Sequence, residues 1–293
     1  MPTTHTADVG HEADHDDIIH PSPVPFLLVH LACFGAIWSG VTAQAVWLAV
    51  TLYVVRMFGV TAGFHRYFSH RSYKTSRVMQ FLLAALAQSS AQRGALWWAA
   101  KHRHHHKHSD LPDDVHSPKH HGFWHAHLGW ILDRDLTNQE RFVPDLLADR
   151  DMRMVHRLFG PLTILTLLGP AVLGGLITWS WAGALTAFFW AGLVRITFLH
   201  HVTWSVNSVC HMIGERPFAA RDKSANFWPL AILSMGEAWH NLHHADPTQA
   251  RHGVRPGQID ISARVIWIFE RFGWAHDVHW PTPERLAKIT KTA

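Results

Sequence analysis

The sequence KHRHHHKHSD, from Lys101 to Asp110, holds five of the 27 histidines of a 293-residue chain. In a helix, His102, His105 and His106 stand at i, i+3 and i+4, so their side chains share one face within an arc of about 100°. His104 then points the opposite way. Neutral imidazole is a common ligand for iron, zinc, copper and nickel, so the spacing predicts a helix that turns three ligands toward a metal.

The same spacing recurs in WHNLHH, where His240, His243 and His244 follow another long apolar region. Two further segments carry candidate ligands. His65 and His70 lie five residues apart in HRYFSH, about 140° apart on an ideal helix, which predicts that they straddle a helix end. Asn207 and His211 lie four residues apart and share one helical face.

Composition indicates a membrane protein. The chain is 48% hydrophobic and only 16% charged, whereas about 25% charged residues is ordinary for a soluble domain. Two cysteines, Cys33 and Cys210, provide neither a disulfide framework nor a cysteine zinc site, and they indicate a reducing compartment.

Four apolar segments, each near the roughly 20 residues that cross a bilayer, predict an all-α fold with four transmembrane helices. Their ranges are about 26–42, 43–64, 159–179 and 181–202. All 26 lysines and arginines lie in 56–157 or 195–293. By the positive-inside rule both termini and the histidine clusters then face the cytoplasm, where the long segments form a helical cap. Four tryptophans are expected to form an aromatic belt at the outer interface: Trp38, Trp47, Trp179 and Trp181.

Two arginines within the apolar segments, and two segments outside them, complete the predicted topology. Arg56 and Arg195 each lie about fourteen residues into their helices, which predicts a shared depth from which they snorkel. Residues 77–99 are apolar but interrupted by Gln88, Gln92 and other polar side chains, and a crossing there would separate His65 from His102. We therefore expect an interfacial amphipathic helix over 77–99. We expect residues 1–23 to form a disordered tail without a signal peptide, and residues 24–293 to form one membrane domain.

The clusters together offer nine histidines on one side of the membrane, too many for one ion and suitable for two. They are His65, His70, His102, His105, His106, His211, His240, His243 and His244. Zinc or copper would accept such ligands, but a zinc hydrolase needs only three plus water, so a dinuclear redox centre with two irons fits better. Asp110, Asp114 and Glu237 are candidates to orient the imidazoles, with surface or capping roles as the alternative.

The other histidines are expected to lie outside this centre. His200 and His201 stand about 15 Å before His211 on the same helix, and His30 is expected to hydrogen-bond within the bundle. His116 and His127 remain open. The following are expected on solvated or interfacial surfaces: His104, His108, His120, His121, His125 and His252.

The segments HRYFSH, HRHHH, NSVCH and GEAWHNLHH occur in this order, with two predicted spans before and two between them. In this they resemble the integral-membrane acyl-CoA desaturases of the stearoyl-CoA, delta-9 type, over about 25–283. The resemblance implies that the nine histidines hold two irons and that Asn207 binds a metal-bound water. It also implies O2-dependent removal of two hydrogens from a saturated acyl chain, between carbons 9 and 10, to leave a cis double bond.

The same resemblance assigns four residues to the lining of the acyl tunnel: Gln92, Trp98, Thr203 and Trp204. The two tryptophans have an alternative role as interfacial anchors. Arg93 and Gly94 replace positions that are often polar and acidic in the family, which leaves the contacts to a CoA head group open. Acyl-CoA, another acyl thioester or a lipid therefore all remain candidate substrates.

Electrons are expected from a separate ferredoxin, rubredoxin or cytochrome b5-like donor with its reductase, because the sequence shows no CxxC array or extra soluble domain. Basic residues including Lys101, Arg103, Lys107 and Arg251 would attract an acidic carrier, CoA phosphates or anionic lipid.

The bilayer is the other expected partner, no nucleic-acid partner is expected, and a bacterial plasma membrane is the expected location. The alternative functions are a related di-iron membrane hydroxylase of fatty acids, alkanes or sterols, and a metal transporter or sensor, which would need polar ligands within the spans.

Overall fold

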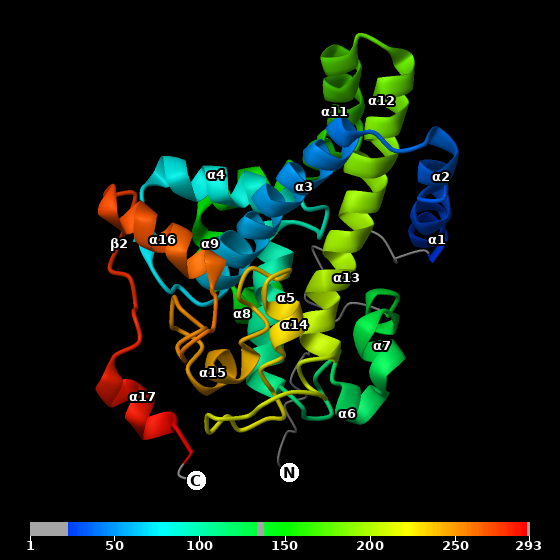
Figure 1. The fold of residues 1–293 in the computed structure, drawn as a ribbon. Coiled ribbons are helices and arrows are strands. Elements are labelled where there is room, and N and C mark those ends of the chain that lie inside the picture. The colour runs from blue at the N-terminus through cyan, green and yellow to red at the C-terminus, as the bar shows by residue number, and fades with distance from the viewer. Residues whose placement is uncertain (1–22, 134–137, 292–293) are drawn as a thin grey trace, which may run out of the picture.

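The computed structural model describes residues 23–133 and 138–291, and the predicted tail therefore lies outside the described residues except for Pro23. These residues are mostly helical, with a bundle of long apolar helices at one end and a cap of short helices at the other (Figure 1). The one sheet among them is a two-stranded pair, β1 (Lys74–Thr75) and β2 (Ala275–His276), which run antiparallel with Lys74 opposite His276.

Three described segments are long and apolar enough to cross a membrane. The first joins α3 (Ala43–Phe58) to the π-helix η1 (Gly59–Ser69), and the second is α11 (Phe159–Thr178). The third runs through α12 (Trp181–Ala187), the π-helix η3 (Phe188–Val194) and α13 (Arg195–Ser208). These spans match three of the four predicted apolar segments.

The predicted first span is divided. It consists of α1 (Pro23–Ala32) and α2 (Gly35–Ser39), and its apolar part is shorter than the other three. The chain tightens between them, because the Phe34 amide donates to the Leu31 carbonyl three residues back, at 3.1 Å, in place of the α-helical partner. The fourth predicted span, over about 26–42, therefore stays a prediction.

Close backbone contact joins α11 to α12, and glycines on both helices allow it. A Cβ atom at Gly174 would collide with the side chain of Ala187, and one at Gly183 would collide with Thr178. Small residues at a helix interface allow this approach and so increase van der Waals contact within a bilayer. The α11–α12 hairpin stands out from the rest of the molecule (Figure 1).

Arg56 and Arg195 meet at Thr166 of α11, which confirms that they lie at one depth. Arg56 Nε donates to Thr166 Oγ1 at 3.2 Å, and Arg195 Nη2 donates to the Thr166 carbonyl at 2.9 Å. That carbonyl lacks a helical partner, because Pro170 has no N–H to donate. Arg195 is only 3% exposed, so the prediction that it snorkels is wrong.

The segment predicted as one interfacial helix over 77–99 forms two helices instead. α4 (Arg77–Gln88) ends at Gln88, and α5 (Ala95–His108) begins after a turn in which Ala91 and Arg93 have φ values of 60° and 67°. α4 keeps exposed apolar residues such as Val78 and Leu82. The break separates α4 from α5, the helix that carries the HRHHH segment.

Gln88 holds this break together. Its side-chain oxygen accepts from the Ala95 amide at 2.9 Å, and its nitrogen donates to the Val155 carbonyl at 2.6 Å, with no exposed surface. Gln88→Ala should leave the Ala95 amide buried and unpaired, at a cost of about 1–3 kcal/mol, while the Val155 carbonyl keeps its bond from the Leu158 amide at 3.0 Å. The measurement is thermal unfolding in detergent, with Gln80→Ala, at a partly exposed site, as a control expected to stay within about 0.5 kcal/mol. Equal melting temperatures for the two variants would contradict the role of Gln88.

The remaining helices form the cap. α8 (Gln139–Phe142), α9 (Pro144–Ala148) and α10 (Arg150–Arg157) lead back to α11, while α15 (His240–Ala245) and α16 (Ile261–Arg271) follow α13. The shorter pieces complete the list: α6 (Pro118–His121), α7 (Phe123–His127), η2 (Gly129–Ile131), α14 (Trp228–Ala231) and α17 (Pro283–Ile289). Buried Phe64, Phe68 and Tyr73 join η1 to the packed alanines of α4 and α5, so one core connects the spans to the cap.

Candidate metal centre

All nine predicted histidines come together, in two groups. Within each group the nearest ring nitrogens lie within 4.8 Å of one another. The larger group takes its side chains from η1, the residue that follows it, α5 and α15; the smaller takes them from α5, α15 and the segment just after α13. The larger contains His65, His70, His102, His106 and His243, and the smaller contains His105, His211, His240 and His244.

The π-helical turn explains how His65 and His70 join one group. In η1 the His70 amide donates to the His65 carbonyl five residues back, at 3.1 Å. Residues five apart therefore stack on one face, and the two rings lie 4.9 Å apart. An ideal α-helix would have separated them by about 140°.

The ring nitrogens of each group converge. Nε2 of His243 lies 3.0 Å from that of His65 and 2.8 Å from that of His106. In the smaller group Nε2 of His211 and of His240 lie 3.2 Å apart. Both α5 and α15 supply side chains to each group, so the two groups are neighbours.

Carboxylates hold the outer nitrogens of four of these rings. His244 Nδ1 donates to Asp222 Oδ2 at 2.6 Å, and His65 Nδ1 lies 2.6 Å from Glu237 Oε2. Asp114 and Asp110 accept in the same way, 3.0 Å from His105 and 3.1 Å from His211 respectively. Buried carboxylates of this kind fix both the ring orientation and the tautomer of a metal ligand.

The tautomer that results favours a cation. Because Nδ1 of His211 donates to Asp110, the Nε2 lone pair of this ring points at the His240 imidazole, with 3.2 Å between the Nε2 atoms. The Nε2 atoms of His105 and His244 are buried without a hydrogen-bond partner. Buried acceptors that face one another without donors are costly unless a cation lies among them, so the residues present fit metal ions in both groups.

Electrostatics keep these groups in the ionisation states that a metal needs. Burial and the neighbouring imidazoles hold the pKa of His106 and His244 well below the usual value, so both rings are neutral at neutral pH. Burial opposes ionisation of Asp110, but contacts with His211 and with the Lys223 backbone N–H lower its pKa to about 2. Neutral imidazoles backed by ionised carboxylates are competent ligands for a divalent or trivalent ion.

Three of these carboxylates, Asp110, Asp114 and Glu237, were sequence candidates, whereas Asp222 was missed. Asp222 and His244 are 22 residues apart, and no local pattern joins them. All four carboxylates are buried. Their contacts with imidazoles favour the orienting role over the alternative role at the surface.

The structure corrects the prediction for His252, which was expected at a surface. It is fully buried, with its Nδ1 3.2 Å from Glu237 Oε2 and its ring 4.6 Å from that of His243. His116, which the sequence left open, is also buried, and its ring lies 4.4 Å from that of His105. Both sit directly behind members of the two groups.

Other histidines lie away from the two groups. His104 stacks on His108 at 4.6 Å and meets Phe142 edge-on at 5.0 Å, which confirms that it leaves the inward face of α5. His30 donates to or accepts from His201 at 3.1 Å within the bundle, as expected, and His201 contacts His127 at 3.0 Å. Three histidines on α6 and α7 lie toward the surface: His120, His121 and His125.

A cavity of about 290 Å³ reaches the larger group, with His102 and Asn207 among its lining residues. The four predicted tunnel residues also line it: Gln92, Trp98, Thr203 and Trp204. Three of them contact one another, since Gln92 donates to Thr203 Oγ1 at 3.0 Å and accepts from Trp98 Nε1 at 3.3 Å.

The two tryptophans shape this cavity. Trp98 stacks on His102, with 5.1 Å between the rings, so this part of the cavity wall is in direct contact with the larger group. Trp204 is only 7% exposed and meets Phe26 of α1 at 5.9 Å. An internal position favours a wall of the cavity over the alternative of an interfacial anchor for Trp204.

Fold and site together define a helical membrane protein with an internal histidine-rich site of the kind that holds metal ions. Comparison with known proteins agrees: the sequence model described as fatty acid desaturase matches residues 42–257. The chain belongs to the fatty acid desaturase family, whose members are oxidoreductases of lipid metabolism.

Several relatives have different named substrates. A hex-5-enoyl-[acyl-carrier protein] acetylenase of Moorena producens is 36% identical, with 85% of this chain and 81% of the relative covered. An acyl-CoA 5-desaturase of Anemone leveillei is 35% identical (89% and 80% covered), and an sn-1 stearoyl-lipid 9-desaturase of Anabaena variabilis is 34% identical (86% and 91% covered). An acyl substrate is therefore common to these relatives, while its carrier and the position of attack differ.

Proposed function

We propose that the protein is an O2-dependent desaturase that introduces a cis double bond at carbon 9 of a saturated acyl-CoA, with an iron ion in each histidine group. The observation that carries this proposal is the convergence of nine imidazoles beside a cavity walled by Trp98 and Trp204. Iron, when bound, supplies the activation of O2. Such chemistry requires neutral nitrogen donors, carboxylates that orient them and an adjacent cavity for the acyl chain.

The chain's own residues would position the substrate. Trp98 and Trp204 present apolar surface to methylene groups, while Gln92 donates to Thr203 Oγ1 at 3.0 Å, so these two polar groups of the wall are paired with each other. Asn207 shares the cavity with His102, and we propose that its side chain holds a water on the metal of that region. These contacts would fix which carbon–carbon bond lies beside the centre.

Two cations support a phosphate-bearing carrier such as CoA. Arg93 and Lys101 both line the acyl cavity, and each lies over the ring of Trp97, at 4.9 Å and 5.6 Å. Guanidinium and ammonium groups at a cavity that is otherwise largely aromatic would bind phosphate oxygens while the acyl chain extends inward. A positive charge at residue 93 is thus compatible with acyl-CoA although the position departs from the family pattern.

Product analysis tests the function. Cells that express the protein, supplied with iron, O2 and a competent reductant, should accumulate cis-9 monounsaturated acyl chains, whose double bonds can be located by mass spectrometry. A hydroxylated product would favour the alternative hydroxylase. The absence of both products, with iron present in the purified protein, would contradict the enzyme assignment.

We propose further that α1 and α2 together make a fourth membrane crossing and that the cap faces the cytoplasm of a bacterial cell. The cations confined to 56–157 and 195–293 support this orientation. In the same product analysis on sealed inverted membrane vesicles, an added protein reductant should support the reaction only where the cytoplasmic face is outward.

A further inference from the structure

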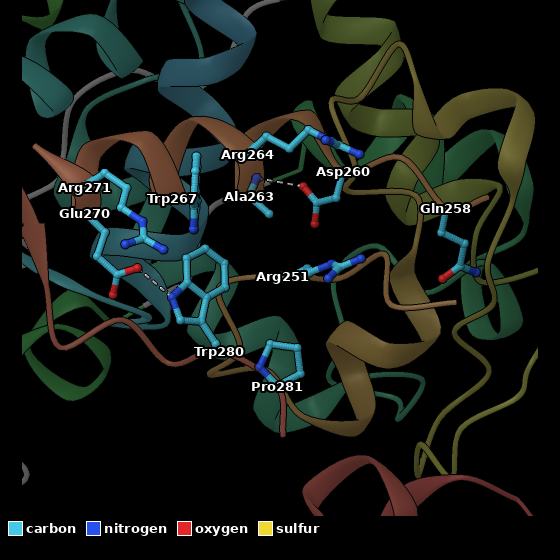
Figure 2. Close-up of a pocket in the computed structure, with 10 residues that line it drawn as sticks. All are labelled: Arg251, Gln258, Asp260, Ala263, Arg264, Trp267, Glu270, Arg271, Trp280 and Pro281. Atoms are coloured by element: carbon cyan, nitrogen blue, oxygen red, sulfur yellow. Dashed lines mark hydrogen bonds between the residues drawn. The ribbon is translucent and has the colours of Figure 1, made fainter. Parts of the chain in front are cut away.

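A second cavity lies against α16. It shares no lining residue with the acyl cavity. It has a volume of about 640 Å³ and is open to solvent (Figure 2). α16 contributes Arg264, Trp267 and Arg271 to it, and Arg251 and Trp280 come from the chain before and after this helix. Figure 2 shows these side chains arranged around one opening.

The charge of this cavity is positive. Arg251, Arg264 and Arg271 are exposed, and none of them forms an ion pair within residues 23–133 and 138–291. Arg271 lies over the Trp267 ring at 5.0 Å. Of the two acidic residues in the lining, Glu270 accepts from Trp280 Nε1 at 2.9 Å, and Asp260 is neutralised by an internal arginine.

That internal arginine connects the cavity to the histidine centre. Asp260 Oδ1 lies 3.0 Å from Arg66 Nη2, and the same nitrogen lies 3.0 Å from Glu237 Oε1. Glu237 in turn lies 2.6 Å from His65 Nδ1. Three short polar contacts therefore lead from the floor of the cavity to an imidazole of the larger group.

The proposed reaction needs an entry for electrons. Removal of two hydrogen atoms from the acyl chain supplies two electrons, and reduction of O2 to two waters consumes four, together with four protons. Two electrons and two protons must therefore come from outside the substrate. The acyl cavity cannot admit the donor while the acyl chain fills it, so the electrons must enter from another side of the centre.

We propose that the α16 cavity is the docking site of a small acidic protein that carries one electron at a time. This inference rests on the proposed function, because it assigns a partner to that redox centre. Two reduced carriers would dock in turn, each would be oxidised, and each would deliver one electron toward His65, while the two protons come from water. The three arginines attract the carrier and orient it, as charge complementarity does in other transient complexes.

The other basic residues that the sequence offered for this role are less suitable. Arg103 is held by Asp145 at 2.7 Å and by backbone carbonyls, and Lys101 is buried beside the acyl cavity. Arg251 is the one member of that predicted set that lines the α16 cavity, and Lys107 does not line it.

Charge reversal tests the docking site. Arg264→Glu and Arg271→Glu are compared with Lys119→Glu, an exposed lysine on α6, in iron-loaded protein reconstituted in nanodiscs of phosphatidylcholine. Plant-type [2Fe–2S] ferredoxin and the soluble domain of cytochrome b5 serve as acidic probes. Each cavity variant should raise the KM for at least one reduced carrier about tenfold and weaken its salt dependence, with kcat at saturating carrier and iron content unchanged.

A chemical reductant tests the proposed desaturase function separately from the docking site. With dithionite, the cavity variants should form product as fast as the unmodified protein. If neither the unmodified protein nor any variant formed product with dithionite, the proposed function would be refuted. Carrier binding, measured by cross-linking, would still test the docking site in that case. Equal carrier KM values and equal cross-linking for the cavity variants and Lys119→Glu would overturn the docking proposal. So would cavity variants that lose only binding to anionic phospholipid vesicles, since the cavity would then be a lipid site.

Discussion

His106→Ala and His244→Ala are each expected to lose bound iron and at least 100-fold of the desaturase activity, whereas His104→Ala should retain both. The rings of His106 and His244 lie 4.4 Å apart, one in each histidine group, so each substitution removes a ligand close to the junction of the two sites. A missing imidazole leaves an open coordination position and a cavity in a tightly packed cluster.

His104→Ala is the matched control because it changes the same residue type on the same helix. Its ring contacts His108 and Phe142 outside the two groups, so its removal should cost only about 1 kcal/mol of stability. Iron is measured by elemental analysis of purified protein, and activity by product formation. If His104→Ala lost iron to the same extent as the other two, the assignment of the inward face of α5 would be wrong.

Asp222→Asn should weaken metal retention and activity by about 10–100-fold without unfolding the protein. The Asp222 carboxylate accepts the Nδ1 proton of His244 at 2.6 Å, and its contact with His244 keeps its pKa below the usual range although burial opposes ionisation. A neutral amide of the same shape keeps the packing but no longer stabilises positive charge on the imidazole–metal unit. We therefore expect faster loss of iron to a chelator.

Asp113→Asn provides the comparison for this carboxylate. Asp113 is exposed, and its nearest imidazole is that of His108, at 3.6 Å and outside the two groups. The rate of iron release at a fixed chelator concentration is the measurement, supported by a thermal melt to show that both variants are folded. Equal release rates for the two variants would show that Asp222 does not support a metal ligand.

Local spacing was sufficient to predict part of the site. The i, i+3, i+4 pattern placed His102, His105 and His106 on one face of a helix and excluded His104, because helical periodicity is set by the backbone alone. The prediction that His65 and His70 straddle a helix end is also confirmed, because His70 directly follows η1; what the pattern did not report is the π-helical turn, which makes residues five apart coincide. The turn widens where η1 packs against α4 and α5, which a local pattern does not report.

Burial was harder to predict than spacing. His252 looked like a surface residue in the polar segment ARHGVRPG, yet it is enclosed beside Glu237 and Arg66. Asp222 lies in an equally polar segment. Both are held inside because charged and imidazole partners from distant parts of the chain satisfy them there, and such partners compensate the cost of removing polar groups from water.

By itself, the sequence determined that this is a helical membrane protein, where three of its long apolar helices lie, and which nine histidines come together. These properties follow from composition, from runs of apolar residues and from local periodicity, which depend on neighbours in the chain. Only the tertiary structure decided how the nine rings divide into two groups, which carboxylates hold them, and that a cationic cavity on α16 connects to His65 through Asp260, Arg66 and Glu237. Those properties depend on contacts between segments far apart in the chain, whose geometry is set by packing.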